Sequence, residues 1–225
     1  MKINILRLVL NTENNLREND AEKIRGYLGD IFWDNPAAHQ HNQKGGLIYQ
    51  YPRVQYKVID GLFYLIGFED GLEIIKKTFQ NLKSINLCGK WEEILHKGLV
   101  SYMTLFSITQ ERIFYYFQTP WLALNEKNYE IYQELRTWEE KKIFLEKILV
   151  GNIISISKSL GYTVQDRIYV NINKTKMINT KLKGIPMIGF TGSFFVNFEI
   201  PDYWGIGKSV SRGFGTIIKQ KQEIL

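Results

Sequence analysis

The order of apolar periodicities in the first part of the chain constrains the fold more than any other feature. Apolar residues alternate along residues 2–10, recur at helical spacing over residues 24–32, and alternate again along residues 54–59 and 62–66. Asp60-Gly61 between the last two runs indicates a β-hairpin, because this pair suits a tight turn with positive φ.

Two further segments complete this first pattern. Residues 71–82 have the spacing of a short amphipathic helix, and a strand follows near residues 84–87. Asp20 is the expected N-cap of the first helix, which should stop before Asn35-Pro36. The resulting βαββαβ order predicts a ferredoxin-like unit, in which two helices cover one face of a four-stranded antiparallel sheet.

A second unit begins after the first. We expect strands over residues 99–107 and 113–118, joined by a turn at 109–112, and then helices over 126–135 and 138–158. Strand patterns return at residues 168–177, 187–200 and 214–219. The sequence therefore predicts an α+β protein of two tandem ferredoxin-like (RRM-like) domains, residues 1–96 and 97–225.

Composition narrows the classes of function. The chain has 29 Lys and Arg against 23 Asp and Glu, and this net charge of +6 favours a polyanionic partner. No apolar run of about 18 residues and no signal-peptide pattern occur, so we expect a cytoplasmic protein with no membrane partner. The single cysteine, Cys88, excludes an internal disulfide and a cysteine-based zinc cluster, and its Leu-Cys-Gly context predicts a packed strand or core position.

A glycine-rich loop, residues 205–215, precedes the last predicted strand. Glycine permits positive φ and close approach to a ligand, so this loop can point N–H groups at a phosphate while Lys208 and Arg212 add charge. The loop is not a Walker A motif, which needs glycine where Asp202 stands, nor a dinucleotide fingerprint, which needs glycine where Val210 stands. A hairpin connection without any ligand is the alternative.

Two of the three histidines are clustered. His39 and His41 lie in a polar turn, and His96 has no partner nearby in the sequence. Imidazole titrates near neutrality, so the pair suits proton transfer. Two alternatives stay open: a surface turn with no task, and a divalent-metal site that includes Asp34, for which third and fourth ligands are not evident.

These features together resemble the CRISPR-associated endoribonucleases that cut repeat RNA, most closely their b-subtype branch. The resemblance is carried by residues 25–29, the His39-Gln-His41 pair, residues 48–57 with 59–61, and the glycine-rich loop. It implies a tandem ferredoxin-like fold, metal-independent cleavage with no cofactor, and a glycine loop that helps to hold RNA. We therefore expect a prokaryotic protein whose partner is CRISPR repeat RNA. The sequence leaves open a homodimer and an association with a CRISPR effector complex.

The chemistry that the resemblance implies is an internal transesterification. The RNA 2′-hydroxyl attacks the adjacent phosphorus, which leaves a 2′,3′-cyclic phosphate and a 5′-hydroxyl. We predict that His39 and His41 share the acid and base roles and that Lys44 stabilises the phosphorane. Tyr49 or Tyr51 is expected to orient the backbone or to donate a proton. The residues expected to contact RNA are Arg25, Gly205, Gly207, Lys208, Ser209, Arg212, Gly213 and Gly215.

Two other classes of function compete with this one. A non-catalytic RNA-binding subunit of a CRISPR effector complex would share the fold and the glycine loop but would not need paired histidines. A small-molecule enzyme on the same scaffold would need a deep pocket and would show no salt-sensitive RNA affinity.

Overall fold

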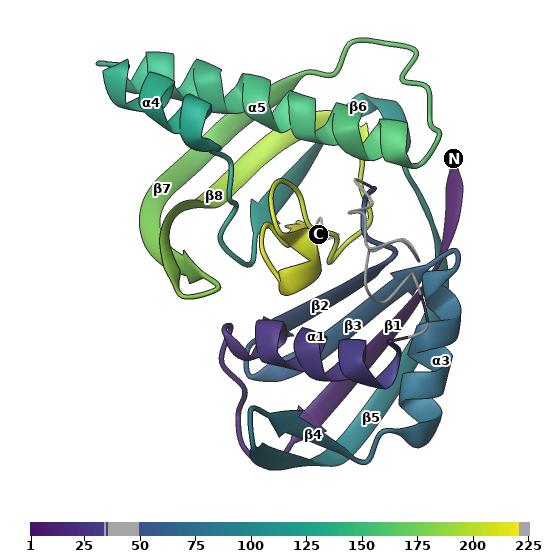
Figure 1. Cartoon of the computed structure of the whole chain (residues 1–225). Coiled ribbons are helices and arrows are strands. Elements are labelled where there is room, and N and C mark those ends of the chain that lie inside the picture. Colours follow the sequence, from purple (N-terminus) through teal and green to yellow (C-terminus); the bar gives the residue numbers. More distant parts are fainter. Residues whose placement is uncertain (34, 36–49, 221–225) are drawn as a thin grey trace, which may run out of the picture. The chain divides into compact units, whose positions relative to one another are not determined.

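The computed structural model describes residues 1–33, 35 and 50–220 (Figure 1). Asp34 and the predicted catalytic residues His39, His41, Lys44 and Tyr49 lie outside this part of the chain. Within it, no helix combines the length and the apolar character that crossing a membrane would require.

The chain folds into two compact units. The N-terminal unit consists of residues 2–105 together with residues 210–213, and the C-terminal unit consists of Met1 and residues 106–209 and 214–225. Both units are antiparallel sheets with helices, so the predicted α+β, tandem ferredoxin-like fold is confirmed.

The N-terminal unit follows the predicted order over most of its length. Its elements are β1 (Lys2–Thr12), α1 (Asp20–Ile31), β2 (Val54–Ile59), β3 (Leu62–Phe68), α3 (Gly71–Asn81), β4 (Ser84–Leu87) and β5 (Lys90–Leu105). The strand order in the sheet is β2-β3-β1-β5-β4. The β2–β3 turn at Asp60-Gly61 has positive φ at both residues, 50° and 78°, as a tight hairpin turn requires.

One hydrophobic core holds both helices on the same face of this sheet (Figure 1). Alternate residues of the strands point into it, which is why β1 contributes Leu6, Leu8 and Leu10. The other buried members come from both helices, from β2 to β4, and from the segments just before α1 and just after α3: Leu16, Ala21, Ile24, Leu28, Val54, Tyr56, Val58, Phe63, Leu65, Ile74, Ile75, Leu82 and Ile85.

The expected domain boundary after residue 96 falls inside β5. This strand pairs with β1 from Lys2↔Leu105 to Thr12↔Ile94, so residues 97–105 belong to the N-terminal unit. The fourth strand of the ferredoxin-like order is therefore β5, and the predicted strand at 84–87 is an additional short edge strand, β4. The predicted four-stranded sheet is thus five-stranded among the described residues.

Three local expectations for this unit are corrected. Asn19, not Asp20, is the N-cap of α1, and its side chain makes no capping hydrogen bond. Asp20 is instead the first helical residue, and its carboxylate accepts a hydrogen bond from the Arg17 backbone N–H at 2.9 Å. Cys88 is exposed in the β4–β5 turn with φ of 55°, so it is not a packed strand residue. The alternation of residues 47–51 also predicts a strand, but Gln50 and Tyr51 lie outside any strand.

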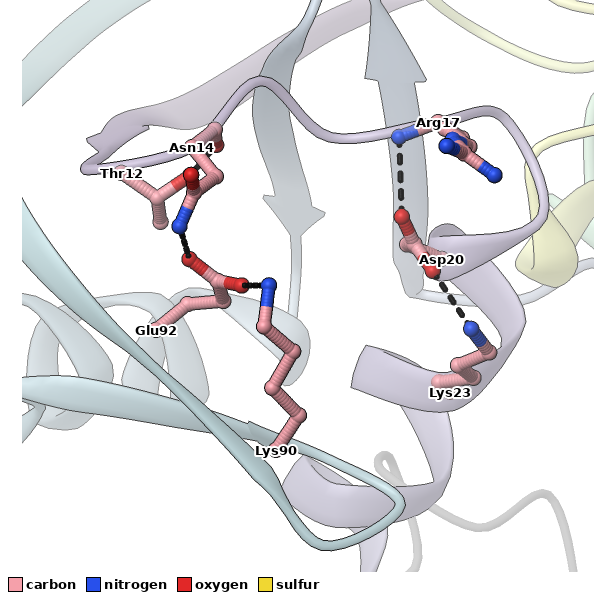
Figure 2. A network of polar contacts seen from close by, with 7 residues as sticks. All are labelled: Thr12, Asn14, Arg17, Asp20, Lys23, Lys90 and Glu92. Atoms are coloured by element: carbon pink, nitrogen blue, oxygen red, sulfur yellow. Dashed lines mark hydrogen bonds and ion pairs between the residues drawn. The ribbon is translucent and has the colours of Figure 1, made fainter.

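Two carboxylates organise polar contacts at the edge of this unit (Figure 2). Asp20 also pairs with the Lys23 ammonium at 2.8 Å. Glu92 accepts a hydrogen bond from the Asn14 amide at 2.7 Å and pairs with Lys90 at 2.6 Å. These contacts lower the pKa of the Glu92 carboxyl and join the β4–β5 hairpin to the segment after β1.

The C-terminal unit has a second sheet, with strand order β7-β8-β6-β9. Its elements are β6 (Ser107–Phe117), α4 (Glu126–Glu134), α5 (Trp138–Ser159), β7 (Val170–Leu182), β8 (Ile185–Glu199) and β9 (Ile217–Lys219). A 3₁₀ helix (Val210–Arg212) precedes β9 in the chain and belongs to the N-terminal unit. The predicted turn at residues 109–112 lies within β6, at a shift in its register with β8. The 3₁₀ helix was not predicted.

Local signals explain the ends of α5. Thr137 and Glu140 form a capping box, in which the Thr137 hydroxyl accepts from the Glu140 N–H and the Glu140 carboxylate accepts from the Thr137 N–H. Gly161, with φ of 67°, follows the last turn, and Gly161 and Tyr162 donate to the carbonyls of Lys158 and Ser157. These two bonds and the positive φ of Gly161 form a Schellman motif, which ends the helix.

Candidate nucleic-acid interface

The segment that carries the predicted catalytic pair connects two well-described elements. It follows α1, which ends at Ile31, and precedes β2, which begins at Val54. His39, His41, Lys44 and Tyr49 lie between these elements and outside the described residues. The site is therefore built here from its other predicted members, the glycine loop and Arg25.

The glycine loop uses several of its backbone amides within the protein. In the C-terminal unit, Ile206 donates to the Gly215 carbonyl at 2.9 Å, Lys208 donates to Leu122 at 3.2 Å, and Gly215 donates to Pro120 at 2.8 Å. These N–H groups are not directed at a ligand. The predicted phosphate cradle would have to use other amides of the loop, while the Lys208 side chain is exposed.

Two of the loop glycines are required by packing. Gly215 has φ of 65°, and a Cβ there would lie 1.9 Å from the Ile206 carbonyl oxygen. Gly207 has φ of 94°, and a Cβ there would lie 2.6 Å from Nε1 of Trp121. Glycine at these two positions therefore allows the loop to close on itself and on Trp121, independently of any ligand.

Residues 210–213 of the loop belong to the N-terminal unit. A Cβ at Gly213 would lie 3.2 Å from the Tyr56 carbonyl oxygen and 3.4 Å from Cβ of Ala21, so this part of the loop packs on β2 and α1. The Arg212 guanidinium forms a hydrogen-bonded ion pair with Glu22 in the first turn of α1. Arg212 thus has an acidic partner within the protein.

Arg25 lies one helical turn beyond Glu22, on the same side of α1. Its Nε is buried and has no hydrogen-bond partner among the described residues. Burial is the main cause that lowers the pKa of its guanidinium, and the charge of Arg212 lowers it further. Tyr56 and Glu22 act in the opposite direction and raise this pKa. A guanidinium with an unpaired N–H is chemically suited to an anionic group such as a phosphate.

The helix-free face of the N-terminal sheet carries further polar groups. Tyr56 and Val58 of β2 point into the core under the helices, so Gln55 and Lys57 point to the opposite face. Arg7 lies on that face and stacks over the Tyr102 ring at 5.8 Å. Lys57 is fully buried, its Nζ has no partner among the described residues, and burial lowers its pKa to about 7.

The sequence could indicate some of these residues and not others. Arg25 and Arg212 were predicted, but Glu22 was missed because its partner lies far away in the sequence. Lys57 was missed because a single lysine in an alternating strand usually faces solvent. Only the pairing of β2 with β3, which sets Lys57 opposite Tyr64, shows on which face of the sheet its side chain lies. The described residues contain no group of three or more His, Cys, Asp or Glu side chains arranged to hold a metal ion.

Comparison with known proteins covers nearly the whole chain. A family model described as the Cas6b N-terminal domain matches residues 1–104, and one described as the Cas6b C-terminal domain matches residues 107–220. The first match ends and the second begins on either side of Leu105 and Phe106, the two residues between which the structure divides the chain.

Two solved structures agree with these matches, and one curated protein is similar to part of this chain. A crystal structure of Cas6b is 36% identical, with a TM-score of 0.89, over 98% of this chain and 100% of that chain. A crystal structure described as the CRISPR RNA processing endoribonuclease Cas6b is 34% identical, with a TM-score of 0.78 and the same coverage. An uncharacterized protein of Methanocaldococcus jannaschii is 43% identical over 63% of this chain and 96% of its own length.

Proposed function

This chain belongs to the Cas6b family, and from that premise we propose that it is an endoribonuclease that cleaves CRISPR precursor RNA within the repeat. The observation that carries the proposal is the likeness, over 98% of the chain, to a solved CRISPR RNA processing endoribonuclease. The excess of positive charge over the whole chain supports an RNA partner. The protein is proposed to act in the cytoplasm of a prokaryote.

The reaction we propose uses the RNA as its own nucleophile. A base removes the proton of the 2′-hydroxyl, O2′ forms a bond to the adjacent phosphorus, and the P–O5′ bond breaks. An acid gives a proton to the leaving O5′. The products are a 2′,3′-cyclic phosphate and a 5′-hydroxyl, and no metal ion or cofactor takes part.

We assign the acid and base to His39 and His41, on the chain between α1 and β2. Lys44 is proposed to stabilise the negative charge of the phosphorane, and Tyr49 to orient the RNA backbone. This assignment rests on the pairing of two imidazoles in one polar segment and on the family. Its support from the structure is indirect: the element before the segment carries Arg25, a cation suited to a phosphate.

The proposed RNA contacts combine side chains and backbone. Arg25 and Lys208 are the side chains best suited to phosphate groups, since neither has an ion-pair partner among the described residues. Arg212 is proposed to act mainly through Glu22, which already pairs with it. The remaining proposed contacts are from the loop residues Gly205, Gly207, Ser209, Gly213 and Gly215.

The histidine assignment is tested by single substitutions. His39→Ala and His41→Ala should each slow single-turnover cleavage of a labelled repeat RNA by about 100-fold or more, because each removes a proton-transfer group. His96→Ala is the matched control, because His96 is exposed on β5. This variant should cleave the RNA as fast as the wild-type protein does. RNA affinity, measured separately, should change little in all three variants.

Two outcomes would reject parts of the proposal. Full cleavage by both His39→Ala and His41→Ala would remove the histidines from the mechanism. Tight binding of repeat RNA by the wild-type protein without any cleavage would instead support an RNA-binding subunit of a CRISPR effector complex.

A further inference from the structure

A small cavity opens in the N-terminal unit where both of its helices end. It has a volume of about 350 Å³ and is lined by the last turns of α1 and α3 and by the β4–β5 hairpin. We call it the α1–α3 pocket. Leu28, Phe32 and Leu82 give it apolar walls. Pockets for small ligands measure about 300–1,000 Å³, so a cavity of this size suits one flat ring system.

Trp91 of β5 lines this pocket and is unusually exposed. It keeps 58% of its surface exposed, although tryptophan is among the side chains that proteins bury most on average. Its ring meets Tyr27 of α1 edge to face, with the centroids 5.9 Å apart and the planes at 87°. Such a contact covers one face of the indole ring at most, so a face of Trp91 stays open to a stacking partner.

The polar groups of the pocket favour an anionic ligand with a hydrogen-bonding edge. Its described lining contains Lys77 and Lys83 and neither Asp nor Glu. Lys77 pairs with Glu73 at 2.8 Å, whereas the exposed Lys83 has no ion-pair partner in the described part of the chain. The Asn81 side chain, which offers both a donor and an acceptor, makes no hydrogen bond to a described residue.

This combination fits an unpaired nucleotide better than a protein partner. Single-stranded RNA is recognised by stacking of a splayed base on an aromatic ring, by hydrogen bonds to the base edge and by cations at the phosphates. A stable protein partner needs a contact of about 800 Å² on each side, which a cavity for one ring does not supply. A base pair is too large to enter, so the base must come from an unpaired stretch.

We propose that the α1–α3 pocket binds one unpaired base of the repeat RNA. The base stacks on Trp91, its edge meets the Asn81 amide, and Lys83 neutralises the adjoining phosphate. This inference rests on the proposed function, since its ligand is the same RNA. It adds a site that reads a base, at residues that neither the histidine segment nor the glycine loop supplies.

The first test is the affinity of the full-length protein for a labelled repeat RNA, kept uncut by a 2′-deoxy group at the cleaved position. Trp91→Ala should raise the dissociation constant by about fivefold or more, because one stacked base is lost. Trp91→Phe should keep most of the affinity, since phenylalanine also stacks. Trp138→Ala is the matched control: Trp138 is 45% exposed on α5, outside the pocket, and its loss should leave the affinity unchanged.

A charge reversal gives a second test that leaves the aromatic contact intact. Lys83→Glu should weaken binding by about threefold or more and should steepen neither folding nor cleavage defects, because the Lys83 side chain is exposed. Lys127→Glu, at an exposed position on α4, controls for the change in net charge. Thermal unfolding of each variant shows that the protein is folded where binding is measured.

An abasic scan of the repeat identifies the base. Removing bases one at a time should reveal one unpaired position whose loss weakens wild-type binding as much as Trp91→Ala does. Combining that abasic RNA with Trp91→Ala should cost no more than either change alone, because both remove the same contact.

Two results would overturn the proposal. One is a folded Trp91→Ala protein that binds the repeat RNA as tightly as wild type does. The other is a loss from Trp91→Ala that adds to the abasic loss at every position, since no base would then be coupled to Trp91. Cleavage is scored separately on unmodified RNA. Normal cleavage with either of these results rejects the pocket and leaves the proposed function standing, and coupled losses without cleavage do the reverse.

Discussion

At the scale of single residues, the ion pair between Glu22 and Arg212 gives two different roles to two arginines. Arg212 is paired within the protein, whereas the Nε of Arg25, a few residues along α1, has no partner in the described part of the chain. Arg212 therefore positions residues 210–213 on α1, whereas Arg25 is the arginine that we propose to contact the RNA. Both side chains of the pair are partly exposed, so its contribution to stability is about 1 kcal/mol or less.

A charge swap distinguishes positioning from direct contact. Arg212→Glu should weaken repeat-RNA binding, because two carboxylates would then repel each other beside α1. The double variant Glu22→Arg with Arg212→Glu should regain most of the lost affinity in a filter-binding or anisotropy measurement. If the double variant binds as weakly as Arg212→Glu alone, Arg212 contacts the RNA itself.

The burial of Lys57 predicts how the stability of the protein depends on pH. Its pKa of about 7 in the folded protein lies below the ordinary value of 10.5, because burial disfavours the charged form. Between pH 7 and pH 10.5, Lys57 is protonated in the unfolded chain and neutral in the folded chain. The free energy of unfolding of the wild-type protein therefore rises with pH over this range. Lys57→Met should therefore be more stable than wild type at pH 7, and this advantage should shrink towards pH 10.5.

The measurement for Lys57 is urea unfolding of both proteins at several pH values. Lys176→Met, at an exposed position on β7, controls for the loss of a lysine charge. An advantage of Lys57→Met that is the same at every pH in this window would show that the Lys57 ammonium is not buried in the folded protein.

Residue roles were predictable where the chemistry is local. Arg25 and the loop cations were identified from residue type and context, and their charge is what the proposed RNA contacts use. Glu22 and Lys57 were not identified, because their surroundings are set by residues distant in the sequence: Arg212 for Glu22, and the register of β2 with β3 for Lys57. A local pattern carries no information on such pairings.

At the scale of elements, the glycine loop packs closely against the rest of the protein, and it is also a candidate ligand site. Gly215→Ala should lower the free energy of unfolding by about 2 kcal/mol or more, since its Cβ would meet the Ile206 carbonyl oxygen at 1.9 Å and its φ is positive. Gly184→Ala is the matched control, because Gly184 has φ of 78° but open space around its Cβ position. Its cost should be limited to about 1 kcal/mol of backbone strain.

Urea unfolding followed by tryptophan fluorescence gives both values for the glycine variants. Equal losses for Gly215→Ala and Gly184→Ala would mean that the loop is not closed against Ile206 as described. A larger loss for Gly215→Ala, with RNA binding reduced in proportion to the unfolded fraction, would identify this glycine as structural.

Most helices and strands were predictable from the spacing of apolar residues and from turn residues, and the exceptions have physical causes. The β2–β3 hairpin and α5 were found because a turn signal or a long helical pattern marks them. β5 and β6 were misread because no glycine, proline or charge separates Leu105 from Ser107, although the two strands belong to different sheets. The turn at Cys88-Gly89, with φ of 55° and 97°, was hidden by the apolar character of cysteine.

At the scale of the whole molecule, the tandem fold was predictable but the place of its division was not. The first unit is complete only with β5, which pairs with β1 across most of the domain sequence, and local patterns cannot show so distant a pairing. Residues 210–213 return to the N-terminal unit, which no linear division of the sequence can represent. The family matches on either side of residues 105–106 agree with the structural division.

We propose that this chain cuts repeat RNA by moving protons rather than by using a metal ion. The most direct measurement is incubation of the purified protein with 5′-labelled repeat RNA in excess EDTA, followed by analysis of the product ends. We expect cleavage at one bond, with a 2′,3′-cyclic phosphate on the 5′ fragment and a 5′-hydroxyl on the other. Cleavage that EDTA abolishes and Mg²⁺ restores, or products with a 3′-hydroxyl, would contradict it.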